Sequence, residues 1–285
     1  MATMFTVLDR ISWPGSSDRA NEDACGASGD WAWVIDTSIF PGTEPIMGER
    51  SDAAWLAGFA SRRLSDLAPN ADDGPSLIRH VMEEARVAFL AVAPDERRDP
   101  VTWPVGAMTL VRRRNESLDV WSFADTTAFV RGPDGVVLTV GEAPGLRQFE
   151  AAKAAELLEA SGATPKTVTQ TPVFQEWLAG RRQRQKEGRG LALLGLDPSA
   201  AGRLRHEAVH CPDGAALLLT SDGFSALVDL YGAMDAAAMM EAALTSGLEP
   251  LAREARRIEI EVDPGGKLYP RFKESDDTTA LLLRV

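Results

Sequence analysis

Four short apolar segments separated by tight turns occupy the middle of the chain, and they limit its fold more than any other feature. The segments cover residues 108–111, 118–123, 128–131 and 136–140. Asn115-Glu116 and Pro133-Asp134-Gly135 have the residue types of turns between neighbouring strands. Connections this short cannot cross over to join parallel strands. We therefore predict an antiparallel meander of four strands.

The flanking sequence adds further strands and alternates them with helices. Apolar or alternating runs predict strands at 5–12, 31–36, 204–209, 215–220 and 278–285. Helical spacing of apolar residues predicts helices at 51–67, 76–92, 149–160, 173–184, 224–230, 236–244 and 250–258. We expect the last strand to pair with earlier ones, which makes residues 1–285 a single domain. This order of elements predicts helices layered on the outside of antiparallel sheets.

The composition excludes several classes of protein. The 285 residues include 30 basic and 42 acidic side chains, a net charge of −12, and such an acidic surface repels nucleic acid. Two cysteines, Cys25 and Cys211, are too few for a disulfide scaffold. The N-terminus lacks the pattern of a secretory signal, and no apolar run is long enough to cross a membrane. We therefore expect a cytoplasmic protein with no membrane or nucleic-acid partner.

Acidic residues stand beside the ends of four predicted strands. Glu22-Asp23 follows the first strand, Asp36 ends WAWVI, Asp222 follows AALLLTS, and Asp276-Asp277 precedes TTALLLR. Carboxylates next to apolar runs are costly unless a positive charge neutralises them. Any one of them could be a turn or cap residue. Together they are the oxygen ligands that Mg²⁺ and Mn²⁺ prefer.

These segments resemble, in order, the motifs of the metal-dependent protein phosphatases of type 2C, the PPM family. The similarity begins with Asn21-Glu22-Asp23 and with Asp36 after an apolar strand. Its strongest parts are LLLTSDGFSAL at 217–227 and DDTTALLLRV at 276–285. Between them, 106–109 (GAMT) and 123–127 (FADTT) are similar to two weaker family motifs. On this basis the chain resembles a divergent, bacterial-type member of the family.

The resemblance implies an α+β fold, a four-layer α-β-β-α sandwich of two antiparallel sheets flanked by helix pairs. It also implies a variable helical insertion, or flap, around residues 142–203. The implied activity is hydrolysis of phosphoserine or phosphothreonine on a phosphorylated protein substrate. Two Mn²⁺ or Mg²⁺ ions are expected, with a third ion left open. Water activated by the ions would attack phosphorus in line, with no covalent intermediate on the protein.

The resemblance also assigns roles to the acidic residues at the strand ends. Asp36 would bridge the two metal ions. Asp222 and Asp276 would hold one ion, and Glu22 would hold or orient the other, largely through water. Asp23 would not bind an ion directly but would support the residues that do.

Three further candidates follow from the same motifs. Asp125 would join Asp222 at a third-metal position found in bacterial members. Thr37 stands where the family has a glycine and would offer its backbone carbonyl to the second ion; this backbone is strained if a positive φ is required. Arg19 lies one place from the usual register of the phosphate-binding arginine and is the candidate for contacting phosphate.

Two other functions stay open on the sequence. Thr37 and the shifted Arg19 are also compatible with a catalytically weak or inactive binding module that keeps the fold. The second alternative is a hydrolase of small phosphate esters. The basic segment 181–189 is either the solvated end of a helix or a flap that attracts a phosphorylated loop by charge.

Overall fold

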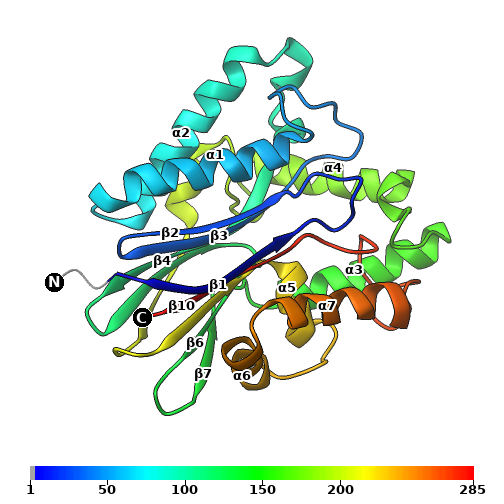
Figure 1. Cartoon of the computed structure of the whole chain (residues 1–285). Helices are drawn as coiled ribbons and strands as arrows, with labels where there is room; N and C mark the ends of the chain where they lie inside the picture. Colours follow the sequence, from blue (N-terminus) through cyan, green and yellow to red (C-terminus); the bar gives the residue numbers. More distant parts are fainter. Residues whose placement is uncertain (1–3) are drawn as a thin grey trace.

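Two five-stranded sheets stacked face to face form the centre of the protein (Figure 1). The computed structural model describes residues 4–285. One sheet has the strand order β1-β10-β9-β6-β7 and the other β2-β3-β4-β5-β8, and the pairings within both are antiparallel. The strands are β1 (Thr6–Trp13), β2 (Asp23–Ser28), β3 (Trp31–Ser38), β4 (Val105–Arg114), β5 (Ser117–Phe123), β6 (Thr127–Arg131), β7 (Val137–Val140), β8 (Arg205–His210), β9 (Ala216–Thr220) and β10 (Thr278–Arg284).

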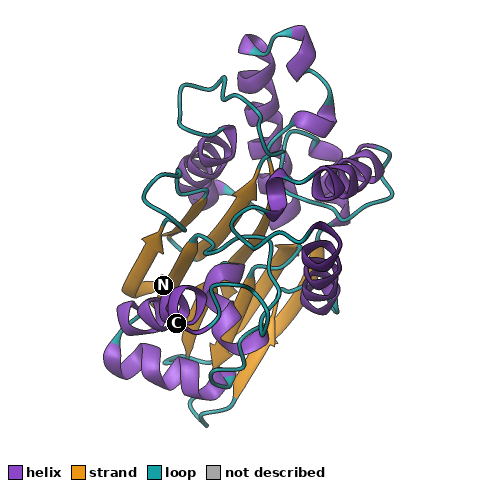
Figure 2. Cartoon of the chain, turned by 90° about the vertical axis from the view of Figure 1, so that its right-hand side faces the viewer, coloured by secondary structure: helices purple, strands orange, loops and turns teal. Residues whose placement is uncertain are grey.

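Helices cover the outer face of each sheet, so the molecule has four layers (Figures 1 and 2). One group packs on the β2-β3-β4-β5-β8 sheet: α1 (Asp52–Leu67), α2 (Gly74–Val92) and the short η5 (Pro198–Arg203). A second group packs on the other sheet: α5 (Asp222–Asp229), α6 (Ala236–Ser246) and α7 (Glu249–Arg257). This arrangement confirms the predicted α+β, α-β-β-α sandwich.

The remaining helices lie toward one end of the sandwich. α3 (Leu146–Ser161) and α4 (Pro172–Lys186) stand at the right of Figure 1, and Figure 2 views the molecule from that side. Both lie within residues 142–203. Short single-turn segments join the larger elements: η1 (Ala68–Asn70), η2 (Asp95–Arg97), η3 (Pro100–Thr102), η4 (Val168–Gln170) and η6 (Ile258–Val262). No helix within residues 4–285 is long and apolar enough to cross a membrane.

Strand β3 shows how the sequence builds the layers. Its odd-numbered residues from 31 to 35 pack toward α1 and α2, and its even-numbered residues Ala32 and Val34 pack between the sheets. Both faces are buried, which is why the strand is a continuous apolar run. The same two-residue period puts Asp36 on the inter-sheet face and Thr37 on the helix face. The carboxylate therefore points into the end of the sandwich.

The predicted four-stranded meander was wrong at its centre. β4 pairs with β5, and β6 pairs with β7, but the chain changes sheets between β5 and β6. Ala124 lies at this crossover with a φ of 58°, a left-handed conformation that non-glycine residues rarely adopt. The sequence signals two hairpins, but the alternation of their strands is compatible with one sheet or with two.

Strand β2 was not predicted from the sequence. Its residues, DACGAS, are small and weakly apolar, so they carry little strand propensity. The strand forms because all six of its residues pair with residues 31–36 of β3. This pairing places Asp23 directly opposite Asp36.

Candidate functional site

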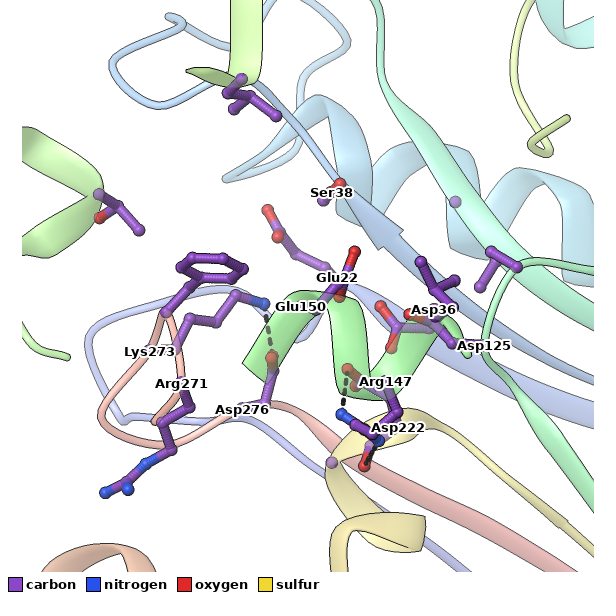
Figure 3. Close-up of a pocket in the computed structure, with 18 of the residues that line it drawn as sticks. Glu22, Asp36, Ser38, Asp125, Arg147, Glu150, Asp222, Arg271, Lys273 and Asp276 are labelled. Atoms are coloured by element: carbon purple, nitrogen blue, oxygen red, sulfur yellow. Dashed lines mark hydrogen bonds and ion pairs between the residues drawn. The ribbon is translucent and has the colours of Figure 1, made fainter. Parts of the chain in front are cut away.

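A cavity of about 280 Å³ at the end of the sandwich collects most of the predicted site residues (Figure 3). We call it the carboxylate cavity. Its walls come from β3 and β4 of one sheet, from α3, α4 and α5, and from the loop before β10. The acidic side chains that line it are Glu22, Asp36, Asp125, Glu150, Asp222, Glu259 and Asp276. The structure thus brings Glu22, Asp36, Asp125, Asp222 and Asp276 to one place, although they are far apart in the sequence.

Asp36 lies among several other carboxylates. Burial and the nearby Asp23, Asp222 and Asp276 raise the pKa of Asp36 well above its ordinary value. Asp23 lies behind Asp36, outside the cavity lining, and burial together with Asp277 raises its pKa well above the ordinary value. No described residue donates a hydrogen bond to either carboxylate oxygen of Asp23. This part of the site holds more negative charge than the chain compensates.

Thr37 does not line the cavity. Its hydroxyl donates to the carbonyl oxygens of Glu22, at 2.5 Å, and Ala53, at 2.8 Å. Among the described residues, only Asn115 and Ala124 are non-glycine residues with positive φ. The concern that Thr37 would strain the backbone was therefore wrong: it takes ordinary strand geometry and ties β3 to Glu22 and α1.

Asp222 is the first residue of α5 and is partly neutralised by Arg147 from α3. Arg147 Nη1 lies 3.4 Å from Asp222 Oδ2, and Arg147 Nη2 donates to the Asp222 carbonyl oxygen at 2.9 Å. Burial raises the pKa of Asp222, but the nearby Arg147 and Lys273 help to outweigh it, so the pKa lies below the ordinary value. Asp222 Oδ1 is buried and has no hydrogen-bond donor among the described residues. This oxygen is therefore free to bind a cation.

Asp276 is paired with Lys273, three residues earlier in the same loop (Figure 3). Burial raises the pKa of Asp276 to about 6, although Lys273 lowers it in part. Burial lowers the pKa of Lys273, but Asp276 and Asp36 raise it well above its ordinary value. Lys273 is therefore a firmly charged cation inside the carboxylate cavity.

Asp277 organises the loops around the site from outside the cavity. Its Oδ1 accepts from the backbone N–H of Gly15, and its Oδ2 accepts from that of Glu22, each at 2.6 Å. The C-terminal loop thereby fixes Glu22, whose carboxylate also accepts from the Ser51 hydroxyl at the start of α1. Burial raises the pKa of Glu22. This positioning role of Asp277 was not assigned from the sequence.

The loop before β10 approaches the start of α5 very closely. A Cβ on Gly223 would lie 2.1 Å from the Asp277 carbonyl oxygen, so only glycine fits. The close approach brings Asp222 and Asp276 to one wall. Gly106 plays the same part beside Asp36, where an added Cβ would lie 2.4 Å from the Asp36 carbonyl oxygen. Both glycines belong to the motifs singled out on the sequence.

The two remaining predicted residues, Asp125 and Arg19, also line the cavity but differ in exposure. Asp125 lines the cavity next to the sheet crossover, and burial with the nearby Glu150 and Asp222 raises its pKa well above the ordinary value. Arg19 also lines the cavity, but its side chain is exposed. Sequence reasoning missed Arg147 and Lys273 altogether. Arg147 pairs with the distant Asp222, which leaves no local pattern, and Lys273 stands three residues before Asp276 in a loop, outside the motifs considered.

The donor set has the chemistry that Mn²⁺ or Mg²⁺ requires: buried carboxylates with uncompensated charge and a free oxygen on Asp222. The carboxylate oxygens do not, however, converge on a single point. Within residues 4–285 no three Asp, Glu, His or Cys side chains stand close enough together to enclose an ion. Lys273 and Arg147 provide part of the positive charge instead. The chemistry of these residues fits divalent ions, provided that the ion pair between Lys273 and Asp276 breaks.

Comparisons with known proteins find relatives by structure and not by sequence. No protein-family model and no curated protein matches the chain. Among solved structures, the PPM Ser-Thr phosphatase MsPP from Mycobacterium smegmatis, in complex with cacodylate, is 20% identical with a TM-score of 0.53, and 98% of this chain and 99% of that chain are covered. The catalytic domain of the serine/threonine phosphatase PstP, with two manganese ions, is 15% identical with a TM-score of 0.54, covering 99% and 98%.

A third similar structure is the photosystem II phosphatase PBCP, at 13% identity and a TM-score of 0.60, with 99% of this chain and 98% of that chain covered. The likeness spans nearly the full length of each protein. The chain therefore has the fold of the PPM Ser/Thr phosphatases, as the sequence motifs predicted. At these identities the comparison establishes the fold, and function is argued from the site.

Proposed function

We propose that the protein is a metal-dependent phosphatase that hydrolyses phosphoserine or phosphothreonine on protein substrates. The observation that carries the proposal is the gathering of Glu22, Asp36, Asp222 and Asp276 around one cavity in a PPM phosphatase fold. A neighbour of that fold holds two manganese ions. A cluster of buried carboxylates is otherwise destabilising, which favours a role that requires the charge.

In this proposal Asp36, Asp222 and Asp276 hold Mn²⁺ or Mg²⁺, and Glu22 orients a water molecule. Bound divalent ions would lower the pKa of that water and offset the charge of the phosphoryl group. Asp125 stands beside Asp222 for a further ion. Thr37 is proposed only as a support for Glu22, because its side chain faces α1.

The chain's own residues supply the remaining functions. Asp23 concentrates negative charge behind Asp36 and keeps it attractive to cations. Asp277 holds the Glu22 backbone in place. Arg19, at the exposed rim, is positioned to contact the phosphoryl group as the substrate enters. The wall formed by α3 and α4 shields the reacting groups from bulk water.

Hydrolysis of a phosphothreonine peptide tests the proposal. We expect activity with Mn²⁺ that is lost with EDTA and lost in Asp222→Ala. Asp18→Ala, an exposed aspartate outside the cavity lining, is the matched control and should keep full activity. Equal hydrolysis with and without metal, or equal loss in both variants, would refute the proposal.

One observation favours a second candidate, a phosphatase-like binding module without turnover. Lys273 and Arg147 already neutralise Asp276 and Asp222, as cations of the chain itself. A module of this kind would bind a phosphopeptide and bind no Mn²⁺. Calorimetric titration with Mn²⁺ separates the candidates, since only the enzyme should show metal binding that depends on Asp36.

A further inference from the structure

We propose that a second, basic cavity beside the carboxylate cavity binds a second oxyanion of the substrate, two residues from the phosphorylated residue. Arg182 would hold this anion at the junction of the two cavities. The inference rests on the proposed phosphatase function, because it assigns substrate specificity to the same site.

The basic cavity has a volume of about 180 Å³ and borders the carboxylate cavity along α4. Arg182 and Gln185 of α4 line both cavities. Four basic side chains and one acidic side chain line it: Arg86, Arg182, Lys186, Arg203 and Asp197. Basic side chains therefore predominate here, whereas seven acidic and six basic side chains line the carboxylate cavity. A cavity with an excess of cations beside a cluster of carboxylates suits a ligand with metal-bound phosphate at one end and a free anion at the other.

Arg182 is a buried cation whose hydrogen-bond donors are not all satisfied within the described residues. It is only 4% exposed, and its Nη1 has no hydrogen-bond partner among the described residues. Its Nη2 lies 3.4 Å from the Ser38 hydroxyl and 3.5 Å from the Ser38 carbonyl oxygen, the limit of a hydrogen bond. Burial and the neighbouring Arg181 lower the pKa of Arg182 to about 10. A buried guanidinium without a carboxylate is costly unless an anion joins it.

The other cations of segment 181–189 do not share this property. Arg181 pairs with Glu150 at 2.7 Å, and Lys186 pairs with Asp99 at 3.1 Å. Arg189 pairs with Glu187, and Arg184 is exposed. The other cations of the segment are therefore paired with carboxylates or exposed, whereas Arg182 is buried without a carboxylate partner.

The position of Ser38 sets the spacing between the two anions. Ser38 follows Asp36 by two residues on β3, and both face the same side of the strand (Figure 3). Two residues along a strand span about 7 Å. An extended peptide laid beside this edge would repeat that distance between every second side chain. A phosphoryl group near Asp36 therefore places the second oxyanion two residues away.

Either a carboxylate side chain or a second phosphoryl group provides this chemistry. Four peptides with one phosphothreonine separate the sources: glutamate, glutamine, phosphoserine or alanine at both positions two residues away. Loss of phosphate from the phosphothreonine, followed by mass spectrometry because phosphoserine is itself a proposed substrate, gives kcat/KM for the wild type, for Arg182→Met and for the exposed control Arg184→Met. Calorimetry with the same peptides in EDTA measures binding without turnover, and p-nitrophenyl phosphate serves as a substrate with no second anion.

We expect the wild type and Arg184→Met to prefer the glutamate or phosphoserine peptide to the glutamine peptide by about tenfold or more. Arg182→Met should lose this preference and keep its activity on p-nitrophenyl phosphate. Equal use of all peptides by the wild type would overturn the proposal. An equal loss on p-nitrophenyl phosphate would also overturn it, because Arg182 would then serve the transferred phosphoryl group. If the wild type hydrolyses nothing, the proposed function fails, and the calorimetric preference still decides on the subsite.

Discussion

Replacing Arg182 by methionine should make the ligand-free protein more stable. The guanidinium is buried without a carboxylate, and its pKa is lowered to about 10 because burial and Arg181 disfavour the cation. In the unfolded chain its pKa has the higher, ordinary value of an arginine. The folded protein is therefore penalised at every pH below about 10, and the penalty decreases only as the pH rises above that value. Methionine retains most of the side-chain length and removes the charge.

The size of the effect follows from the difference between the two pKa values, which corresponds to about 3 kcal/mol. Some packing of the arginine stem is lost, so we expect a net gain of about 1–3 kcal/mol in the free energy of unfolding at pH 7. In a chain of this length that is about 2–5 °C in Tm. Urea unfolding in chloride buffer, free of phosphate and carboxylates, measures it, with Arg184→Met as the control. A loss of stability in Arg182→Met, or a gain matched by Arg184→Met, would refute the reasoning.

Three further predictions concern the carboxylate cavity. Lys273→Met removes the cation that competes with Mn²⁺ for Asp276. Calorimetry should show the affinity for Mn²⁺ rising about tenfold or more. Unchanged affinity would contradict the proposed competition. Gly223→Ala places a methyl group against the Asp277 carbonyl oxygen, and urea unfolding should show a loss of about 1–3 kcal/mol; stability equal to wild type would contradict the close approach. Mn²⁺ binding should weaken as the pH falls through about 6, because the raised pKa of Asp276 lets protons compete for the ligand oxygens. A Mn²⁺ affinity that stays constant between pH 7 and pH 5 would contradict this competition.

The sequence predicts the architecture well where the apolar pattern is strong. The segments around β3, β9 and β10 are continuous apolar runs because both faces of each strand are buried. The helix positions follow from their apolar spacing. The β5–β6 crossover and strand β2 were not predictable in the same way, because the first depends on sheet partners and the second on pairing alone.

The candidate site is predictable in its acidic part only. Asp36 and Asp222 end strand segments, so the resemblance of ordered motifs identifies them without a structure. Arg147 and Lys273 lie in segments with no motif. The pairing of Arg147 with Asp222 depends on the folded arrangement of distant elements, and the pairing of Lys273 with Asp276 depends on how their loop folds. Arg182 belongs to a basic segment visible in the sequence, but which of its side chains is buried depends on how α4 packs. The proposed single-domain boundaries and the flap role of 142–203 stay predictions.

Anomalous diffraction from crystals soaked in Mn²⁺ tests the central claim most directly, because it counts the ions and identifies their ligands. We predict peaks in contact with Asp36 and with Asp222 or Asp276, and Lys273 displaced from Asp276. A cavity that takes up no manganese, with the Lys273–Asp276 pair intact, would contradict the metal-dependent mechanism and leave a phosphatase-like binding module as the better description.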